Sequence, residues 1–235
     1  MKLAIFCDFD GTITTKDVGD ALFRKFGNFE KHWQEFIEGE CNVRELNKRL
    51  YASIPTSVTL ADIKEFVIQH EVDAYFLPFI DYCKMQGHSF TVVSDGYDIY
   101  IYEILKKLDA SIDKIFCNKL YYENGKFTPS FFGADENCKC LTASCKRNVV
   151  LTNSSDDDIL VYIGDGMTDF CAAEHCDIIF AKSQLAKYCN ENKIPHHPFK
   201  SFFDVKRTIE TLVAKKNIKR RNQAFLKRKN AFEAE

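Results

Sequence analysis

This sequence of 235 residues has no long apolar run, little net charge, and few glycines and prolines. No apolar run approaches the roughly 20 residues that a membrane-spanning helix requires, so we expect no membrane association. The formal net charge of −2 gives the molecule no strong field that would attract nucleic acid or an anionic surface. With only 10 glycines and 5 prolines, the composition also excludes collagen-like and low-complexity chains.

The composition that is present is typical of a globular domain. Hydrophobic residues make up 46% of the chain and charged residues 28%, which is enough apolar surface to offset the conformational entropy of the chain. The apolar N-terminus runs at once into Asp8 and Asp10, which makes it too short for a signal peptide. We therefore expect a cytoplasmic protein, in which most of the 10 cysteines are small buried hydrophobic residues rather than disulfide partners.

Short apolar runs without polar alternation indicate the fold. Three such runs, at residues 3–7, 89–93 and 159–163, each end in a polar turn, and weaker examples occupy residues 114–117 and 177–181. A strand that is apolar on both faces is typical of a parallel sheet covered on both sides. Because segments of helical length separate these runs, the sequence predicts an α/β fold with a Rossmann-like doubly wound parallel sheet.

The gap between the first and second predicted strands is too long for a simple crossover. It spans about 75 residues, whereas a connection between parallel strands needs only a dozen or more. Its apolar spacing predicts helices at residues 17–26, 29–38, 42–51, 59–70 and 73–86. We interpret residues 1–14 and 76–213 as a core domain, residues 15–75 as a helical cap and residues 214–235 as a basic C-terminal tail. A lid is favoured over an independent helical domain, because both ends of the insert emerge beside the polar turns.

Acidic side chains follow the predicted strands. Asp8 and Asp10 follow the first strand, Asp165 follows the third, and Asp169 lies one helical turn beyond Asp165. In open α/β sheets the carboxyl ends of the strands form the ligand site, so these carboxylates should meet there. Without a cation several of them would take up protons, and oxygen-only ligands favour Mg²⁺. A substrate with oxygens that a metal can share fits this site, and phosphate fits best.

Other residues at the same edge suit phosphoryl transfer. A carboxylate can attack phosphorus and form an aspartyl-phosphate. Gly11 and Gly96 allow a ligand to approach their backbone N–H groups closely. Ser94 precedes a predicted helix, so its hydroxyl and the helix N-terminus could hold phosphate oxygens. Lys146, at the start of an apparent helix before the third strand, could neutralise charge in the transition state.

Four short motifs together resemble those of haloacid dehalogenase superfamily phosphatases. They are residues 8–12 (DFDGT), residues 94–96 (SDG), Lys146 and residues 164–169 (GDGMTD), in the order that the superfamily shows. The position of the helical insert is similar to that in the phosphoserine phosphatase-like branch. Within this branch, residues 8–14, the Cys-rich segment that leads into Lys146 and residues 177–205 resemble the methionine-salvage phosphatases.

The resemblance implies a role for each matching residue. Asp8 is the implied nucleophile, and Asp10 is the implied general acid that later activates water. The implied Mg²⁺ ligands are Asp8, the backbone carbonyl of Asp10, and Asp165, with Asp169 as a supporting carboxylate. The implied phosphate-binding residues are Gly11, Thr12, Ser94, Asp95, Gly96 and Lys146.

Two motifs depart from the pattern of that branch. Asp95 replaces the first of two glycines that usually follow the serine, and Gly166 and Met167 stand where Ser and Val are typical. Asp95 could contact the substrate or cap the helix that begins near Tyr97. Asp17 could likewise contact the substrate or serve as a helix N-cap.

Two further features have both a functional and a purely structural interpretation. Cys138, Cys140 and Cys145 could bind a structural Zn²⁺ with a fourth ligand from elsewhere, for instance Cys117, but reduced loop thiols are the simpler interpretation. The basic residues 215–229 could contact nucleic acid, but we favour a solvated terminal helix or a frayed end.

The sequence therefore predicts a Mg²⁺-dependent phosphomonoester hydrolase that acts on a small phosphorylated metabolite, with a methionine-salvage intermediate among the candidates. A phosphoserine phosphatase and a phosphotransferase share every residue named above. A binding protein that uses the basic tail or the Cys cluster is the alternative from a different class. Oligomeric state is left open.

Overall fold

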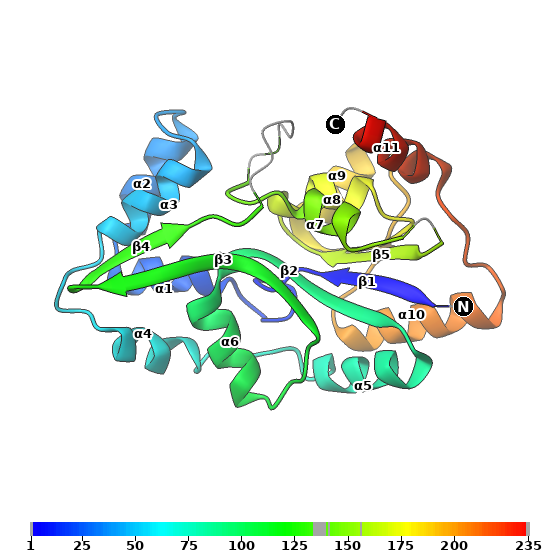
Figure 1. Cartoon of the computed structure of the whole chain (residues 1–235), viewed down its shortest axis with the longest axis horizontal. Coiled ribbons are helices and arrows are strands. Elements are labelled where there is room, and N and C mark those ends of the chain that lie inside the picture. Colours follow the sequence, from blue (N-terminus) through cyan, green and yellow to red (C-terminus); the bar gives the residue numbers. More distant parts are fainter. Residues whose placement is uncertain (1, 134–139, 141, 156, 234–235) are drawn as a thin grey trace.

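Seven strands form one sheet in the order β4-β3-β2-β1-β5-β6-β7 (Figure 1). The structure is a computed structural model that describes residues 2–133, 140, 142–155 and 157–233. All neighbouring strands pair in parallel except β3 and β4, which are antiparallel. The predicted doubly wound α/β fold is confirmed. The strands are β1 (Leu3–Cys7), β2 (Ser89–Tyr97), β3 (Lys114–Glu123), β4 (Lys126–Ser130), β5 (Ile159–Gly164), β6 (Ile178–Ala181) and β7 (His197–Pro198).

Strand β1 lies at the centre of the sheet, and all five of its residues are buried. Leu3 and Ile5 belong to the core on one face of the sheet, whereas Ala4 and Phe6 belong to the core on the other. Both faces are apolar, which explains why the sequence of this strand shows no polar alternation.

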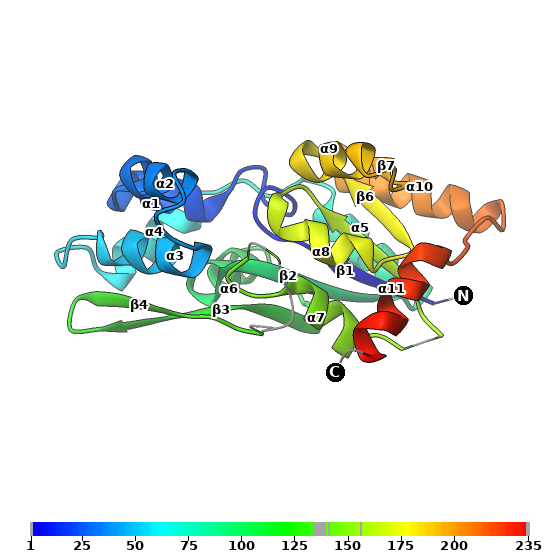
Figure 2. The ribbon, with the colours of Figure 1, turned by 90° about the horizontal axis from the view of Figure 1, so that it is seen from above.

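Helices cover both faces of the sheet (Figures 1 and 2). α5, α6 and α10 pack on one face, and α7, α8 and α9 on the other. Within the described part of the chain, none of the helices has the length and apolarity needed to cross a bilayer. The helices are α1 (Val18–Phe26), α2 (Phe29–Ile37), α3 (Val43–Ala52), α4 (Leu60–Val67), α5 (Phe76–Gln86), α6 (Asp98–Lys107), α7 (Lys146–Thr152), α8 (Phe170–Glu174), α9 (Ser183–Glu191), α10 (Phe202–Ala214) and α11 (Asn222–Glu233), with a 3₁₀ turn at Met167–Asp169.

Helices α1 to α4 form the insert between β1 and β2 and lie at one end of the molecule (Figure 2). The chain leaves and re-enters the core through two adjacent segments, where Thr14 and Val72 form an antiparallel bridge. The N–H of Thr15 also donates to the carbonyl of Glu71 at 2.9 Å. This narrow neck directly follows the turn that carries Asp8 and Asp10. It suits our interpretation of residues 15–75 as a cap, which stays a prediction.

The β3–β4 hairpin was not predicted from the sequence, which indicated only residues 114–117 as a strand. Its two-residue turn is formed by Asn124 and Gly125, both with positive φ (51° and 76°). Asn-Gly is a strong signal for this turn, because both positions require left-handed backbone. The hairpin extends beneath the cap, where the ring of Phe127 lies 6.4 Å from that of Tyr51.

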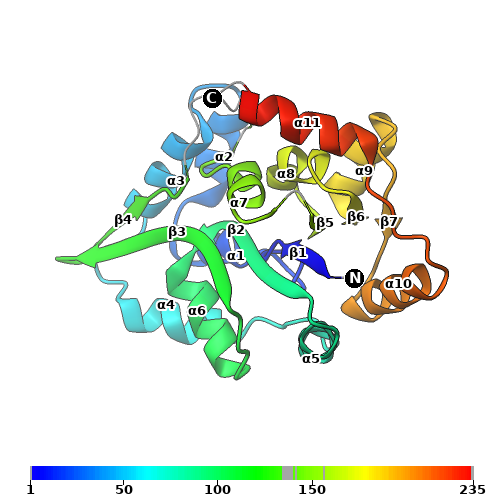
Figure 3. The same ribbon diagram turned by 45° about the vertical axis from the view of Figure 1, so that its right-hand side comes forward.

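The basic tail ends in helix α11, which lies across the α8 side of the molecule (Figure 3). Arg221 donates to the backbone carbonyls of Ala173 and Cys176, each at 3.1 Å, and Arg228 pairs with Asp177 at 3.2 Å. These cations lie at the C-terminal end of α8, where they stabilise exposed carbonyls. The expected terminal helix is present, but these two arginines are docked rather than solvated.

Candidate active site

Three carboxylates meet at the carboxyl ends of β1 and β5. One oxygen from each of Asp8, Asp165 and Asp169 lies within 4.8 Å of the other two. β1 and β5 pair in parallel, with Cys7 opposite Ile163, so the residues that follow each strand are neighbours. Of the four carboxylates expected to meet at this edge, Asp8, Asp165 and Asp169 do so, whereas Asp10 is not in this group. Asp8 and Asp169 are both buried.

Lys146 links two of these carboxylates. Its Nζ donates to Asp8 Oδ1 at 2.6 Å and to Asp169 Oδ1 at 2.7 Å, and its side chain is only 2% exposed. Burial alone lowers the pKa of Lys146, but Asp169 and Asp8 more than offset this, and the net effect is a raised pKa. Lys146 therefore stays charged and holds one oxygen of Asp8 in place.

Asp169 has hydrogen-bond donors on both of its oxygens. Besides Lys146, Oδ1 accepts from the Tyr162 hydroxyl at 2.7 Å. Oδ2 accepts from the backbone N–H groups of Asp165 and Gly166, at 2.9 and 3.0 Å. These four hydrogen bonds hold the carboxylate in one orientation. Its surroundings fit the supporting role that the sequence implies.

Asp165 lies against the turn that follows Asp8. Thr12 Oγ1 donates to Asp165 Oδ1 at 3.0 Å. Gly11 has a φ of +69°, and a Cβ there would lie 2.6 Å from Asp165 Oδ2, so only glycine fits. Burial, followed by the charge of Asp169, raises the pKa of Asp165 to about 6. Burial likewise raises the pKa of Asp8 well above its usual range.

The side chain of Asp10 points away from this cluster, toward the cap. Its Oδ2 accepts from the Tyr100 hydroxyl at 2.7 Å and its Oδ1 from the N–H of Val18 at 2.9 Å. Burial raises the pKa of Asp10 to about 8, and the charge of Asp17 adds to the shift. At neutral pH this carboxyl group is mostly protonated and can donate a proton.

Ser94 and Gly96 lie within β2 rather than beside a helix N-terminus. The strand continues through Tyr97, and its pairing register with β3 shifts between Val93 and Tyr97. The helix expected near Tyr97 is present, since α6 begins at Asp98, and an irregular strand segment separates Ser94 from its N-terminus. The N–H of Gly96 donates to Ser94 Oγ at 2.9 Å. A Cβ on Gly96 would lie 1.9 Å from the Tyr100 hydroxyl, so this position has no room for a side chain.

The carboxylate of Asp95 is used to hold the loop that leads into Lys146. It accepts from the N–H groups of Ala143 and Ser144, at 2.9 and 2.8 Å, and from the side-chain amide of Asn118 at 3.2 Å. Both oxygens are engaged there, and a substrate contact by Asp95 stays a prediction. The helix-cap alternative is wrong, because α6 has no side-chain cap.

Asp17 serves as the N-cap of α1. Its carboxylate accepts from the N–H of Asp20 at 2.7 Å. The capping interpretation is therefore confirmed, and a substrate contact by this exposed residue stays a prediction.

The cysteine cluster differs from the expected one. Cys138 lies outside the described residues, whereas Cys140 and Cys145 lie together with Cys171. Cys117, which was considered as a fourth ligand, is not in this group. Cys171 is far from the Cys-rich segment in sequence, which is why spacing alone did not indicate it.

Two tyrosines near the carboxylates were missed. Tyr100 is the hydrogen-bond donor to Asp10, and Tyr162 is a donor to Asp169. Each lies in an apolar stretch, Tyr100 in a helix and Tyr162 in a buried strand, where a tyrosine is typical of packing. No sequence signal in a single chain distinguishes these hydroxyls from those of core residues.

Comparison with known proteins gives the family. A model of haloacid dehalogenase-like hydrolases matches residues 5–174. The chain is 32% identical over 217 residues to the 2-hydroxy-3-keto-5-methylthiopentenyl-1-phosphate phosphatase of Bacillus cereus, covering 91% of this chain and 98% of that protein. A protein of the same name from Brevibacillus brevis is 32% identical over 214 residues, covering 89% of this chain and 96% of that protein.

Solved structures share the fold. A phosphoserine phosphatase determined as a phospho-aspartyl intermediate analogue superposes with a TM-score of 0.67 at 21% identity, covering 89% of this chain and 98% of that one. The phosphoserine phosphatase of T. onnurineus gives a TM-score of 0.65 at 16% identity, covering 89% of this chain and 94% of that one. Taken with the family match and the relatives at 32% identity, the chain belongs to the haloacid dehalogenase-like hydrolase family.

Proposed function

We propose that this chain is a Mg²⁺-dependent phosphomonoesterase that works through a phosphorylated Asp8. One observation carries the proposal. Asp8 lies buried at the carboxyl edge of the sheet, held by Lys146 at 2.6 Å and next to Asp165, while a second carboxyl group, Asp10, faces the cap with a pKa of about 8. A fixed nucleophile beside a separate proton donor is the arrangement that ester cleavage in two steps requires.

In the first step, Asp8 attacks phosphorus. Lys146 holds Oδ1, so we assign Oδ2 as the attacking oxygen. The bond between phosphorus and the ester oxygen breaks, and the leaving oxygen takes the proton of Asp10. Lys146 neutralises negative charge on the phosphoryl group as the bonds change. The products are an alcohol and an aspartyl-phosphate on Asp8.

In the second step, Asp10 acts as a base. Now ionised, its carboxylate takes a proton from a water molecule, whose oxygen attacks phosphorus. The bond to Asp8 breaks, which releases inorganic phosphate and restores the Asp8 carboxylate. Asp10 is again protonated, so the cycle is balanced in protons.

The residues at the site fit a magnesium ion. Three carboxylates within 4.8 Å offer only oxygen donors, which hard cations prefer. Burial and the charge of Asp169 raise the pKa values of Asp8 and Asp165, and a bound divalent cation would favour the ionised form of both. Since the oxygens of Asp169 are engaged, we assign Asp8, Asp165 and the backbone carbonyl of Asp10 as ligands. When bound, magnesium would neutralise charge on the phosphoryl oxygens.

For the substrate, we propose a small keto phosphate with a thioether, like that named for the curated relatives. Aromatic rings lie where the cap meets the core: Tyr51 is 4.7 Å from Phe23 and 4.8 Å from Tyr97, measured between ring centroids. Aromatic rings make favourable contacts with thioether sulfur. The hydroxyl of Tyr51 is buried and has no hydrogen-bond partner among the described residues, so a polar substrate atom could satisfy it.

A screen of phosphorylated metabolites with Mg²⁺ tests this proposal. The keto phosphate should give the highest kcat/KM, above those of phosphoserine, phosphocholine and sugar phosphates. Tyr51→Phe should raise the KM for it by up to about tenfold, the value of one hydrogen bond, with little change in kcat. A preference for phosphoserine would overturn the substrate assignment but leave the phosphatase assignment intact. No hydrolysis of any ester would contradict both.

The pH dependence of turnover should report Asp10. Because its pKa is about 8, Asp10 is protonated below that pH and loses its proton as the pH rises through it. Cleavage of an alkyl phosphate, whose leaving oxygen needs that proton, should therefore decline above about pH 8. The Tyr100 hydrogen bond lowers this pKa, so Tyr100→Phe should move the alkaline decline to higher pH.

Tyr97→Phe is the matched control for this measurement. The Tyr97 hydroxyl donates to Asn47 Oδ1 at 2.9 Å rather than to Asp10, so the alkaline limb should stay in place. An equal displacement in both variants would show that the limb does not report Asp10.

A further inference from the structure

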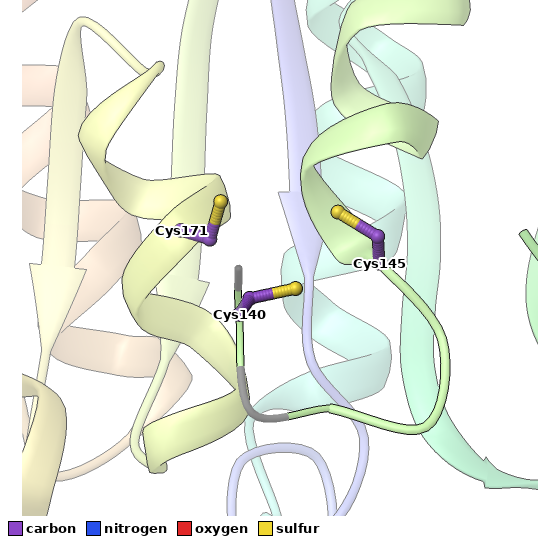
Figure 4. A group of neighbouring side chains, drawn as sticks. All are labelled: Cys140, Cys145 and Cys171. Atoms are coloured by element: carbon purple, nitrogen blue, oxygen red, sulfur yellow. The ribbon is translucent and has the colours of Figure 1, made fainter. Parts of the chain in front are cut away.

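Three cysteine side chains gather beside the segments that carry Lys146 and Asp169. The sulfurs of Cys140, Cys145 and Cys171 lie within 4.8 Å of one another. Figure 4 shows them facing the space between the start of α7, which follows Cys145, and α8, which carries Cys171. Cys140 approaches from the loop before α7. The loop that leads into α7 and helix α8 thus direct three thiols to one place.

The position of this cluster is tied to the active site through the chain itself. Cys145 directly precedes Lys146, and Cys171 lies two residues after Asp169. Lys146 and Asp169 are joined at 2.7 Å. A connection between the sulfurs would therefore join the segments that carry Lys146 and Asp169 a second time.

We infer that Cys140, Cys145 and Cys171 bind a structural zinc ion. Thiolates are preferred zinc ligands, and structural zinc sites use three or four of them in a tetrahedral arrangement. The described residues supply three of the four ligands that such a site uses. This inference is independent of the proposed phosphatase activity.

A reactive or redox-sensing thiol is a poorer fit to the same cluster. Reactive cysteines are accessible and have lowered pKa values. Cys145, by contrast, is only 3% exposed. Three converging sulfurs, rather than two, also exceed what a disulfide would use. A metal that replaces the thiol protons accounts for all three.

Zinc at this place would position Lys146 rather than take part in the chemistry. The loop before Lys146 is already held by hydrogen bonds from Ala143 and Ser144 to Asp95. The metal would tie the next residue, Cys145, to α8. Together these contacts would fix the backbone of Lys146 from both sides, so that its Nζ reaches both Asp8 and Asp169.

Metal analysis of the full-length protein tests the inference. The protein should be produced with added Zn²⁺ and dialysed, and its metal content measured by mass spectrometry. We expect about one tightly bound zinc ion per chain, with three or four sulfur neighbours at about 2.3 Å by X-ray absorption. Replacement by Co²⁺ should give the intense absorption of cobalt–thiolate bonds. None of these three measurements needs a variant or an activity assay.

Variants then locate the ion. Cys140→Ser and Cys171→Ser should each weaken zinc binding at least about tenfold, since even changes beyond the ligand shell cost about 10- to 100-fold. Cys41→Ser and Cys117→Ser, which lie outside the cluster, should bind zinc as the unmodified protein does. Asp165→Asn should also retain it, which separates this site from the carboxylates.

The inference would be overturned by any of three results. One is the absence of bound zinc in folded protein prepared with Zn²⁺. Another is oxygen and nitrogen neighbours alone in the X-ray absorption spectrum. The third is unchanged zinc affinity in Cys140→Ser and Cys171→Ser, with circular dichroism confirming that both variants are folded.

Discussion

Asp8→Asn is expected to lower the turnover of a phosphomonoester at least about 10³-fold, because the amide cannot form the aspartyl-phosphate. The fold should survive the change. Burial already raises the pKa of Asp8, which means that the site disfavours its charge. Lys146 also keeps Asp169 as a partner at 2.7 Å. Steady-state kinetics with an aryl phosphate measures the turnover, and urea unfolding measures the stability of the fold.

Asp81→Asn is the matched control for this substitution. Asp81 is an exposed aspartate of α5 that lies on a helix away from the carboxylate cluster. The same chemical change there should leave turnover within about twofold, as expected for surface substitutions without special contacts. Full activity in Asp8→Asn would rule out Asp8 as the nucleophile.

Lys146→Met should have the largest effect on stability. The side chain is 2% exposed and pairs with Asp8 and Asp169, so its loss leaves two buried carboxylates without their cation. Removing one partner of a buried ion pair typically costs about 3–5 kcal/mol of unfolding free energy. Turnover should also fall below detection, because no other described residue holds Oδ1 of Asp8. Urea unfolding without added metal gives the free energy directly.

The stability that Lys146→Met loses should depend on pH in a predictable direction. Lys146 lowers the pKa of Asp8, so its removal raises that pKa further in the folded protein. A raised folded-state pKa favours folding at low pH and disfavours it as the pH increases. The stability deficit of Lys146→Met should therefore narrow on acidification.

Lys187→Met provides the comparison. Lys187 is 78% exposed and faces Glu191 at 3.9 Å, one helical turn away. Exposed pairs of this kind contribute about 0–1 kcal/mol. If Lys146→Met and Lys187→Met lost similar amounts of unfolding free energy, the stabilising role that we give to the buried pairs of Lys146 would be contradicted.

The sheet could be predicted from the sequence because its physical requirement is local. A strand covered on both faces must be apolar throughout, and β1 shows this over Leu3–Cys7. The parallel pairing of β1 and β5 then places Asp8 beside Asp165, as strand ends share one edge. The same reasoning with the motif resemblance led to Lys146.

Other features depend on contacts that one chain's sequence does not encode locally. Asp95 holds Ala143 and Ser144, which lie almost fifty residues further along, so its carboxylate could not be assigned from its motif. Cys171 joins Cys145 only because α7 and α8 pack side by side. The hairpin turn at residues 124–125 did carry a local signal, Asn-Gly, which the apolar pattern obscured.

The central claim is a covalent phosphoryl group on Asp8, and Asp10→Asn is the variant that exposes it most directly. Nitrophenolate leaves without needing a proton, so p-nitrophenyl phosphate should still phosphorylate this variant in the presence of Mg²⁺. Hydrolysis of the intermediate should be slow, since Asp10 no longer activates water. Rapid mixing should give a burst of about one nitrophenol per site, and mass spectrometry after acid quenching should place the added phosphoryl group on Asp8. A variant that turns over without a burst, and whose Asp8 peptide carries no phosphoryl group, would contradict the account.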